Sequence, residues 1–338
     1  MVRLIPGRVH RAFRSSYLEQ PPADSVVFVL VAAALAVGAL FGLASVAGPV
    51  RVVNRLSHPH WRWIPLAFAA TMASYLGYIV AYREAAYVEH GPQPSLRRVG
   101  ALVVGGFGLF VPRGGFRLDL DALKLAGVSP AEARVRTLTL ATLEYAVLAP
   151  AAFAVAVLLL LHGSPTELSV RLPWAVGVPV GAVASLWLLR HRVALARAGG
   201  LRRSLAHGLD AIVQTIRLWS RPGHGLLAFA GMSVYWAADI FVLWACLAVF
   251  SPAGRIGIAE LVLGYATGYA LTRRALPLAG AGAVEALLPV ALAWTGIALA
   301  TAVISVFAYR LFNLWLPLLP AVAAVFLLRR SSGRSLRV

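Results

Sequence analysis

Charged residues are scarce in this chain. Only 13% of its 338 residues are charged and 60% are hydrophobic, with a mean hydropathy of +0.78. A soluble domain carries roughly 25% charged residues. So little polar surface could not keep a chain of this length in water. We therefore place it among the integral membrane proteins before any motif is considered.

Cysteine is almost absent, because Cys246 is the only one. This excludes an intramolecular disulfide and any cysteine-based metal site. The eight histidines are scattered, and His58 and His60 have no third ligand near them in the sequence. We expect no metal and no cofactor.

Acidic residues are also few, with 13 against 31 basic ones and a net charge of +18. In a soluble protein such a balance would suggest nucleic acid. Here the arginines lie between apolar runs, which favours membrane orientation and anionic lipid headgroups instead. We expect lipids as partners and no nucleic acid.

Two kinds of enzyme site are disfavoured by the sequence, a glycosyltransferase site for lipid-linked sugars and a nucleotide-binding loop. The segment Pro49–Arg62 contains no Asp or Glu, whereas a multi-pass glycosyltransferase acting on lipid-linked sugars would need carboxylates in its first outer loop. The glycine-rich string Gly105–Gly108 follows no strand and is not a nucleotide loop.

Long apolar runs are what the chain does contain. The runs predict an all-α fold, a polytopic membrane helix bundle of about eight transmembrane helices. The clear candidates are Val26–Ala47, Trp63–Tyr82, Thr137–Leu161, Leu172–Leu189, Leu226–Phe250 and the short Gly257–Leu271.

Two apolar regions are irregular. Val99–Pro112 is too short to cross, and Leu276–Leu328 is interrupted by prolines and glycines, which indicates one broken or re-entrant piece plus one or two crossings. Pro112-x-x-Gly115 and Pro277-x-x-Gly280 share a spacing. An internal repeat with interrupted helices is typical of transporters. Chance similarity in an Ala/Gly/Leu-rich chain is the rival explanation.

Arginine counts give an orientation and a domain plan. Arg190–Arg221 and the C-terminal tail are arginine-rich, which places both, with the N-terminus, in the cytoplasm of a multi-pass protein of the inner or plasma membrane. The three arginines of Arg51–Arg62 on the outer side run against this trend. We expect a basic leader (1–24), a transmembrane domain (25–330) and a tail (331–338), with no cleavable signal peptide. Possible halves are 25–189 and 225–330, joined by an amphipathic helix at 201–220.

Two helices have sharper local signals. Ser129, Pro130 and Glu132 form a capping-box pattern, which predicts a helix beginning at Pro130. Segment 201–220 has apolar residues at three- and four-residue spacing. This helix either lies on the inner leaflet or packs on its own bundle, and the sequence does not choose between them.

A few ionisable residues lie inside apolar runs, where each costs ~2.5–3.5 kcal/mol on insertion scales. They are Glu144, Asp239, Glu285, Arg310 and Glu260, the last of which lies nearer a membrane edge. Arg310 has Glu285 just across the expected turn. The two form either a structural ion pair or a site in which the arginine receives a lipid phosphate.

The broken segment before Glu285 supports the second reading. A helix that starts near Pro277, Gly280 and Gly282 would direct free N–H groups into the membrane, and such an N-terminus binds phosphate or carboxylate. A simple bend in a packed helix is the alternative. Arg113, beside the earlier break, could act in the same way, or could belong to an ordinary cytoplasmic loop.

The C-terminal third carries a resemblance. The segment Leu276–Leu288 resembles the P-G-G-x-G-x-x-E element of the lysylphosphatidylglycerol synthase transmembrane-region family, the flippase-like membrane domain of multiple peptide resistance factor in its stand-alone form. Tyr309–Pro317 fits the family's Arg, Trp and Pro pattern. Ala279 and Ala281 stand where the family commonly has glycine. The likeness covers roughly residues 25–330.

The resemblance implies a lipid translocator with two related halves and re-entrant elements. The expected function is movement of an anionic phospholipid or lipid-linked headgroup between leaflets, with Arg310, Glu285, Gly280, Gly282, Pro277, Arg113, Glu144 and Asp239 as substrate-binding candidates. The chain ends eight residues after Arg330, so we expect no aminoacyl-transferase domain and no enzyme. The alternatives are a membrane scaffold or regulator of a cell-envelope glycosyltransferase, and a membrane lipid enzyme. An envelope-biosynthesis enzyme or a second copy of the chain remain open as partners.

Overall fold

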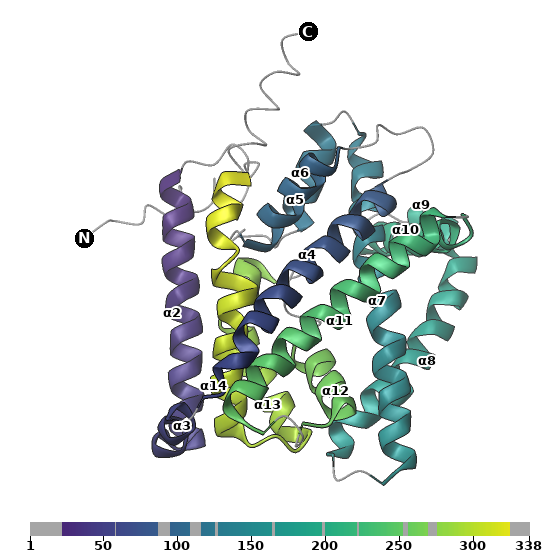
Figure 1. Ribbon diagram of the computed structural model, residues 1–338. Helices are drawn as coiled ribbons and strands as arrows, with labels where there is room; N and C mark the ends of the chain where they lie inside the picture. The colour runs from purple at the N-terminus through teal and green to yellow at the C-terminus, as the bar shows by residue number, and fades with distance from the viewer. Residues whose placement is uncertain are drawn as a thin grey trace.

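Every regular element in the described part of the chain is a helix (Figure 1). The computed structural model describes residues 22–57, 59–86, 95–108, 116–125, 128–163, 166–197, 200–221, 223–252, 256–269 and 276–324. Six helices are long and apolar enough to cross a membrane, and they are Val26–Ala47, Trp61–Ala85, Pro130–Leu161, Leu168–Arg190, His224–Phe250 and Leu299–Ala324. The expectation of a membrane-embedded, all-helical protein is confirmed at this level.

The elements follow the chain in a simple order. They are α2 (Pro22–Ala47), α3 (Pro49–Leu56), η2 (Trp61–Trp63), α4 (Ile64–Ala86), α5 (Leu96–Gly108), α6 (Phe116–Leu125), α7 (Pro130–Leu161), α8 (Leu168–Arg190), α9 (Arg192–Arg197), α10 (Gly200–Trp219), α11 (His224–Phe250), α12 (Ile258–Tyr269), η4 (Pro277–Gly280), α13 (Ala283–Trp294), α14 (Leu299–Arg310) and η5 (Leu311–Trp315).

One expected span is not among the six. The run Gly257–Leu271 contains α12, whose 12 residues extend about 18 Å at 1.5 Å per residue, less than the ~30 Å hydrocarbon core. Residues 270–275 lie outside the described part. The long apolar region after Leu276 supplies the short η4 and α13, followed by one span, Leu299–Ala324, in agreement with the expected broken piece plus one or two crossings.

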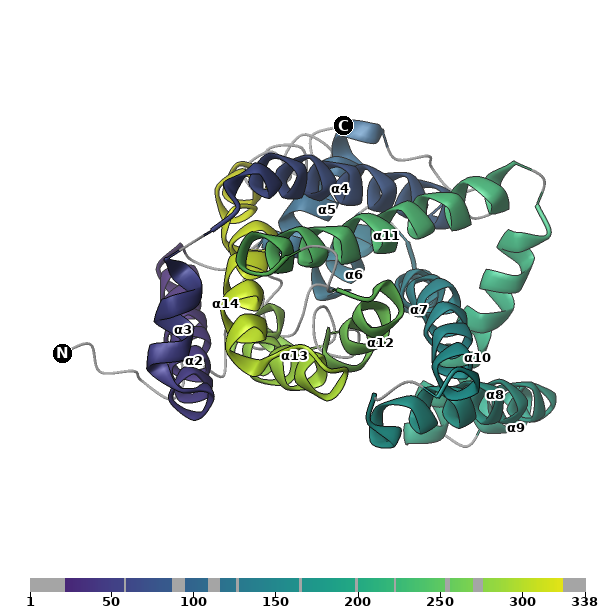
Figure 2. The same ribbon diagram turned by 60° about the horizontal axis from the view of Figure 1, so that its bottom comes forward.

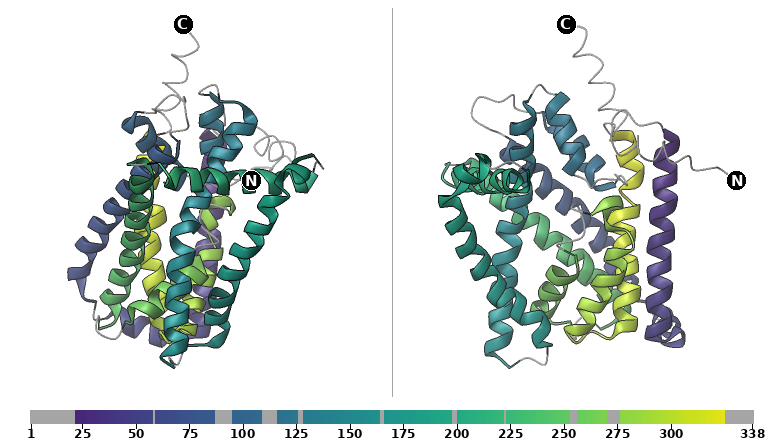
Figure 3. Two further views of the ribbon diagram at one scale, coloured as in Figure 1. Left: turned by 90° about the vertical axis from the view of Figure 1, so that its right-hand side faces the viewer. Right: turned by 180° about the vertical axis from the view of Figure 1, so that it is seen from behind.

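Two pairs of short helices lie at opposite ends of the molecule. Helices α5 and α6 pack together at the end where α2 begins, and α12 and α13 pack together at the end where α2 finishes (Figures 1 and 3). The turn of the first pair, with Arg113, lies outside the described residues. The turn of the second pair includes η4.

Helices α4 and α11 cross at two facing glycines, and Figure 2 shows them side by side. A β-carbon on Gly77 would lie 2.6 Å from the Gly231 carbonyl oxygen, and one on Gly231 would lie 2.7 Å from the Gly77 oxygen. Only glycine permits this approach in either helix. Next to the crossing, the Tyr78 ring packs edge-on against Tyr235 and Phe107. This contact brings the backbones of α4 and α11 close together.

The predicted start of α7 is confirmed. Ser129 is the N-cap, Pro130 is the first helical residue, and the Ser129 hydroxyl accepts the Glu132 N–H at 3.3 Å. The Glu132 carboxylate bonds to Arg136, one turn further on. The cap fixes where the chain turns from the α5–α6 pair into a long helix.

Of the two placements that the sequence leaves open for α10, the structure shows packing on the bundle. It packs on α7, and its buried residues include Leu209 and Leu218. Leu201, Ile216 and Trp219 of the same helix are exposed. In the left view of Figure 3, α10 runs across the upper end of the long helices. It therefore has an inner side on the bundle and an outer side that can lie on a membrane surface.

Candidate functional site

Arg310 and Glu285 form a fully buried ion pair in the interior of the bundle. Arg310 Nε donates to Glu285 Oε1 at 2.7 Å, and the two side chains are 1% and 0% exposed. Arg310 Nη2 also donates to the Ala279 carbonyl oxygen at 3.2 Å. Among the described residues, the third guanidinium nitrogen, Nη1, is buried without a hydrogen-bond partner. The site thus has one donor to spare.

The same carboxylate caps the helix that follows the break. Gly282 is the N-cap of α13, and its N–H donates to Glu285 Oε2 at 2.8 Å. The expected helix end is therefore present, but the donor at its cap is occupied by a side chain of its own first turn. Glu285 bridges a guanidinium and a helix N-terminus, which is the position where a bound anion was expected.

The turn before α13 has a left-handed backbone. Leu278 and Ala279 have φ of +55° and +53°, and Gly280 and Gly282 have φ of +69° and +83°. Two non-glycine residues in this region carry strain, since each left-handed residue with a side chain costs ~1–2 kcal/mol. Strained backbone concentrates at functional sites. The backbone of Pro277 begins the turn as the first residue of η4.

Replacing Ala279 by glycine is expected to stabilise the protein. Glycine adopts φ near +53° without a β-carbon clash, so the Ala279→Gly variant should gain roughly 0.5–1 kcal/mol. Ala281, equally buried, has φ of −57°, so Ala281→Gly should lose roughly 0.4–1 kcal/mol. Thermal unfolding in one detergent would compare the two variants. Equal shifts in both would show that the left-handed turn stores no strain.

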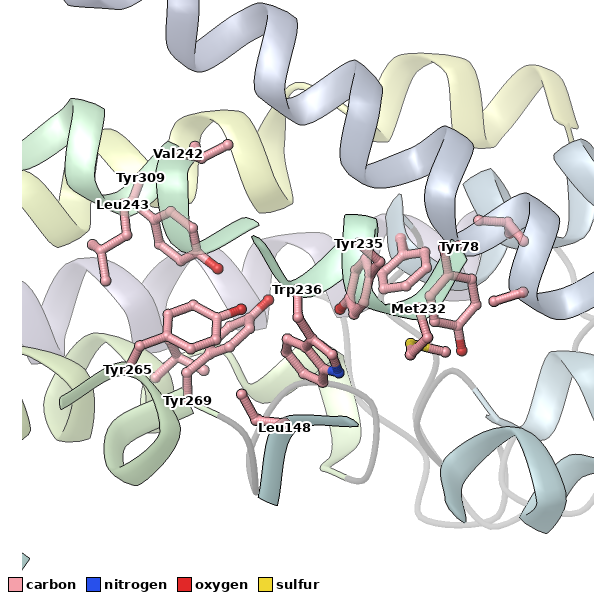
Figure 4. Packing of buried hydrophobic residues seen from close by; sticks show 14 of the residues in the cluster. Tyr78, Leu148, Met232, Tyr235, Trp236, Val242, Leu243, Tyr265, Tyr269 and Tyr309 are labelled. Carbon is pink, nitrogen blue, oxygen red and sulfur yellow. The ribbon is translucent and has the colours of Figure 1, made fainter. Parts of the chain in front are cut away.

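Asp239 is the centre of a second buried cluster. Its Oδ2 accepts from the hydroxyls of Tyr265 and Tyr309, the latter at 2.8 Å, and its Oδ1 accepts from Asn313 Nδ2 at 2.8 Å. Asn313 Oδ1 in turn accepts from the Tyr269 hydroxyl at 3.0 Å. Figure 4 shows the rings of Tyr265, Tyr269 and Tyr309 gathered on one side of Trp236. The cluster ties α11, α12, α14 and η5 together.

The Tyr309→Phe variant is expected to weaken this cluster. It removes a donor to Asp239 and an acceptor for Asn313. Buried polar groups left unsatisfied cost ~1–3 kcal/mol, and the unfolding transition should fall accordingly. Thr142→Val is the control, because its exposed hydroxyl bonds only to its own helix at Leu138. Equal loss in both variants would contradict a special role for the cluster.

Glu144 lies on the other side of Trp236. Its Oε1 accepts from the Tyr78 hydroxyl, and its carbonyl oxygen accepts from Trp236 Nε1 at 2.9 Å. The Trp236 ring packs edge-on against Tyr265 at 5.9 Å between centroids, and Tyr265 is a hydrogen-bond donor to Asp239. Trp236 therefore separates the two acids and contacts the surroundings of each.

The structure brings most of the sequence candidates into two adjoining groups. Arg310, Glu285, Gly280 and Gly282 form one group, and Asp239 joins it through Tyr309, the residue before Arg310. Glu144 lies apart, on α7. Arg113 is outside the described residues, and only the backbone of Pro277 is described.

Sequence reasoning missed the aromatic partners of Asp239. Tyr265 and Tyr269 are four residues apart, as are Tyr309 and Asn313, so each pair lies on one helix face. Polar side chains at this spacing in apolar helices were the available signal. The expectation that Glu285 would pair with Arg310 is confirmed by their hydrogen bond.

The arrangement contains a buried guanidinium, buried carboxylates and a helix N-terminus, which are groups that bind charge. No group of three His, Cys, Asp or Glu side chains with metal-binding geometry occurs in the described ranges. A guanidinium beside a helix N-terminus is a set of donors suited to a phosphate or carboxylate. In comparisons with known proteins, no family model and no curated protein matches the sequence.

Proposed function

We propose that the protein is a flippase-like lipid translocator, which moves an anionic phospholipid or lipid-linked headgroup between leaflets. The observation that carries the proposal is the fully buried Arg310, paired with Glu285 at an unwound turn in the interior. A buried charge in a membrane is costly and usually marks a substrate or ion path. Irregular backbone at such depth is tolerated where protein surrounds it or a polar cavity adjoins it.

In the proposed mechanism, Glu285 holds the place of the substrate phosphate. Its carboxylate uses the Arg310 guanidinium and the Gly282 N–H, two kinds of donor that phosphate also prefers. An arriving phosphate would take these donors and the spare Arg310 Nη1, and Glu285 would turn away. Return of Glu285 would release the headgroup. Exchange of one anion for another avoids leaving the arginine unpaired in the membrane, which would cost several kcal/mol.

The acyl chains have a separate, apolar route. A groove of about 690 Å³ lies between α7, α11 and α12, and its wall includes Leu148, Trp236, Ile240 and Leu261. Trp236 separates it from the polar surroundings of Glu144. A lipid tail could therefore stay in contact with apolar side chains while its headgroup follows the polar interior.

The proposed architecture is an inverted repeat. Helices α4 to α7 and α11 to α14 each comprise a long helix, a short hairpin and another long helix, and the two hairpins lie at opposite ends (Figure 1). The reciprocal contact of Gly77 and Gly231 fits a pseudo-two-fold axis through the α4–α11 crossing. Six helices of the described residues are long and apolar enough to cross a membrane, and the count of about eight transmembrane helices stays a prediction. Such repeats underlie alternating access in transporters.

The proposed orientation follows the arginines. The end with α10 would face the cytoplasm of the inner or plasma membrane, with both termini on that side. The sequence has no recognisable nucleotide-binding loop. We therefore propose that a gradient, a partner protein or downhill consumption of the lipid drives the movement.

A membrane scaffold or regulator of an envelope glycosyltransferase is the second candidate function. It is favoured by the exposed apolar residues of α10, Leu201, Ile216 and Trp219, which a partner could cover. A lipid enzyme is a third reading and would form product in detergent with purified protein. A scaffold should tolerate removal of the whole pair in Arg310→Met/Glu285→Gln and fail on changes at exposed positions.

Leaflet-resolved lipid accessibility in proteoliposomes tests the proposal. Wild type and a folded Arg310→Ala variant would be compared across fluorescent anionic, zwitterionic and polyprenyl-phosphate lipids. We expect one class to move with wild type and to stop with the variant. If folded wild type moves no lipid, translocation is wrong and the scaffold reading stands.

A further inference from the structure

A short amphipathic helix lies at the end of the molecule where α2 finishes. Helix α3 follows Gly48, whose φ of +91° allows the chain to turn sharply out of α2. Arg51, Asn54 and Arg55 are spaced at i, i+3 and i+4, so they share one helix face. Val50 and Val53 point elsewhere and are largely exposed. Such a helix suits the bilayer interface, with its valines toward lipid.

The polar face of α3 lines a cavity of about 490 Å³. Its other wall is formed by the end of α2 and the first turn of α14, at Ala298, Leu299 and Ala300. Ala298 is the N-cap of α14 and has no side chain that could cap it. The cavity thus faces two guanidinium groups and the first N–H groups of a helix, which are donors, and one side-chain amide, which can donate through its NH2 group.

The positive charge of Arg51 and Arg55 has no acidic partner in the described part of the chain. In the described residues, neither Arg51 nor Arg55 takes part in an ion pair or a side-chain hydrogen bond. The sequence from Val26 to Trp63 contains no Asp or Glu at all. These arginines also lie where the positive-inside trend expects few, so orientation in the membrane does not explain them.

We propose that this cavity binds the phosphate of an anionic lipid headgroup. Arginine forms paired charge-assisted hydrogen bonds with phosphate oxygens, and Asn54 and the α14 N–H groups add further donors. The interfacial setting favours a lipid over free phosphate, because the exposed Val46, Val50 and Val53 beside the cavity would contact acyl chains.

The cavity is a site separate from Arg310. Leu299 begins α14 and Arg310 ends it, so the two lie about 17 Å apart along the helix. Binding at the cavity does not require translocation, so the site stands even if the proposed function falls. If the cavity site and the proposed translocation are both correct, the cavity binds a headgroup at the interface before or after it passes Arg310.

Equilibrium binding of phosphatidylglycerol to the purified full chain tests the site. Native mass spectrometry in a neutral detergent would compare wild type, Arg51→Gln/Arg55→Gln and the control Arg62→Gln. Arg62 lies over the Trp63 ring and does not line the cavity. We expect the double variant to weaken binding about tenfold or more, and the control to match wild type. Arg51→Lys/Arg55→Lys should be intermediate, because charge remains but the paired geometry is lost.

Other results would overturn the assignment. Unchanged binding in the double variant would remove the site, and equal weakening by Arg62→Gln would reduce it to non-specific surface charge. Millimolar inorganic phosphate should displace the lipid poorly. If phosphate binds as tightly as phosphatidylglycerol, the ligand is free phosphate and the lipid assignment is wrong. Phosphatidylglycerol should still bind to the Arg310→Met variant. This result would show that the cavity binds the lipid even when translocation fails.

Discussion

Arg310→Met is expected to destabilise the protein strongly and to abolish lipid movement. Methionine fills much of the same volume but leaves Glu285, which is 0% exposed, as an uncompensated buried charge. Breaking one side of a buried pair costs ~3–5 kcal/mol. The loss would be measured as a lower unfolding midpoint in detergent, together with leaflet accessibility in proteoliposomes.

A double variant separates folding from function. Arg310→Met/Glu285→Gln removes both charges, and the side-chain carbonyl of the introduced glutamine can still accept the Gly282 N–H, so most of the lost stability should return. Lipid movement should not return, because no guanidinium is left for the phosphate. Restored movement in the double variant would show that the pair is only structural. Arg171→Met is a matched control, since the buried Arg171 donates to the Leu159 carbonyl oxygen and lies outside the proposed path.

Gly231→Ala is expected to force apart the two helices that cross at the centre. The added β-carbon would lie 2.7 Å from the Gly77 oxygen and 2.9 Å from the Ala81 nitrogen. Both are backbone atoms and cannot turn aside, so one helix must shift. Overpacking costs ~1–3 kcal/mol. Gly181→Ala, on α8, is the control, because its β-carbon would meet no atom within 4 Å.

The reciprocal geometry makes this prediction stricter. Gly77→Ala should cost about as much as Gly231→Ala, since the two contacts mirror each other. The double variant should cost less than the sum, because a single separation of the helices relieves both clashes. Unfolding midpoints of the four proteins would show this directly. Additive losses would mean that the two glycines occupy independent environments.

Local signals in the sequence predicted the parts of the structure that depend on near neighbours. Apolar runs, the Ser129 cap and the break at Pro277 each act within a few residues. The pairing of Arg310 with Glu285 was also predictable, because an arginine within an apolar run needs an acid and only a few are available.

Contacts between distant segments were not predictable in the same way. Gly77 and Gly231 are ordinary glycines among thirty, and their meeting depends on how α4 and α11 cross. The tyrosines around Asp239 come from two helices far apart in sequence. Occupation of the α13 N-terminus by Glu285 needed the backbone of the turn, because a carboxylate three residues into a helix can face either its cap or solvent.

The helix that carries Arg310 changes its winding directly after that residue. Leu311–Trp315 form a π turn, and the Leu316 N–H donates to the Leu311 carbonyl oxygen at 2.8 Å. A π turn holds one residue more than an α turn, so the faces before and after it are offset by about 100°. The direction in which Asn313 points is thus set by the number of residues in the chain as well as by their identity. Deletion of one residue within the turn would remove this offset.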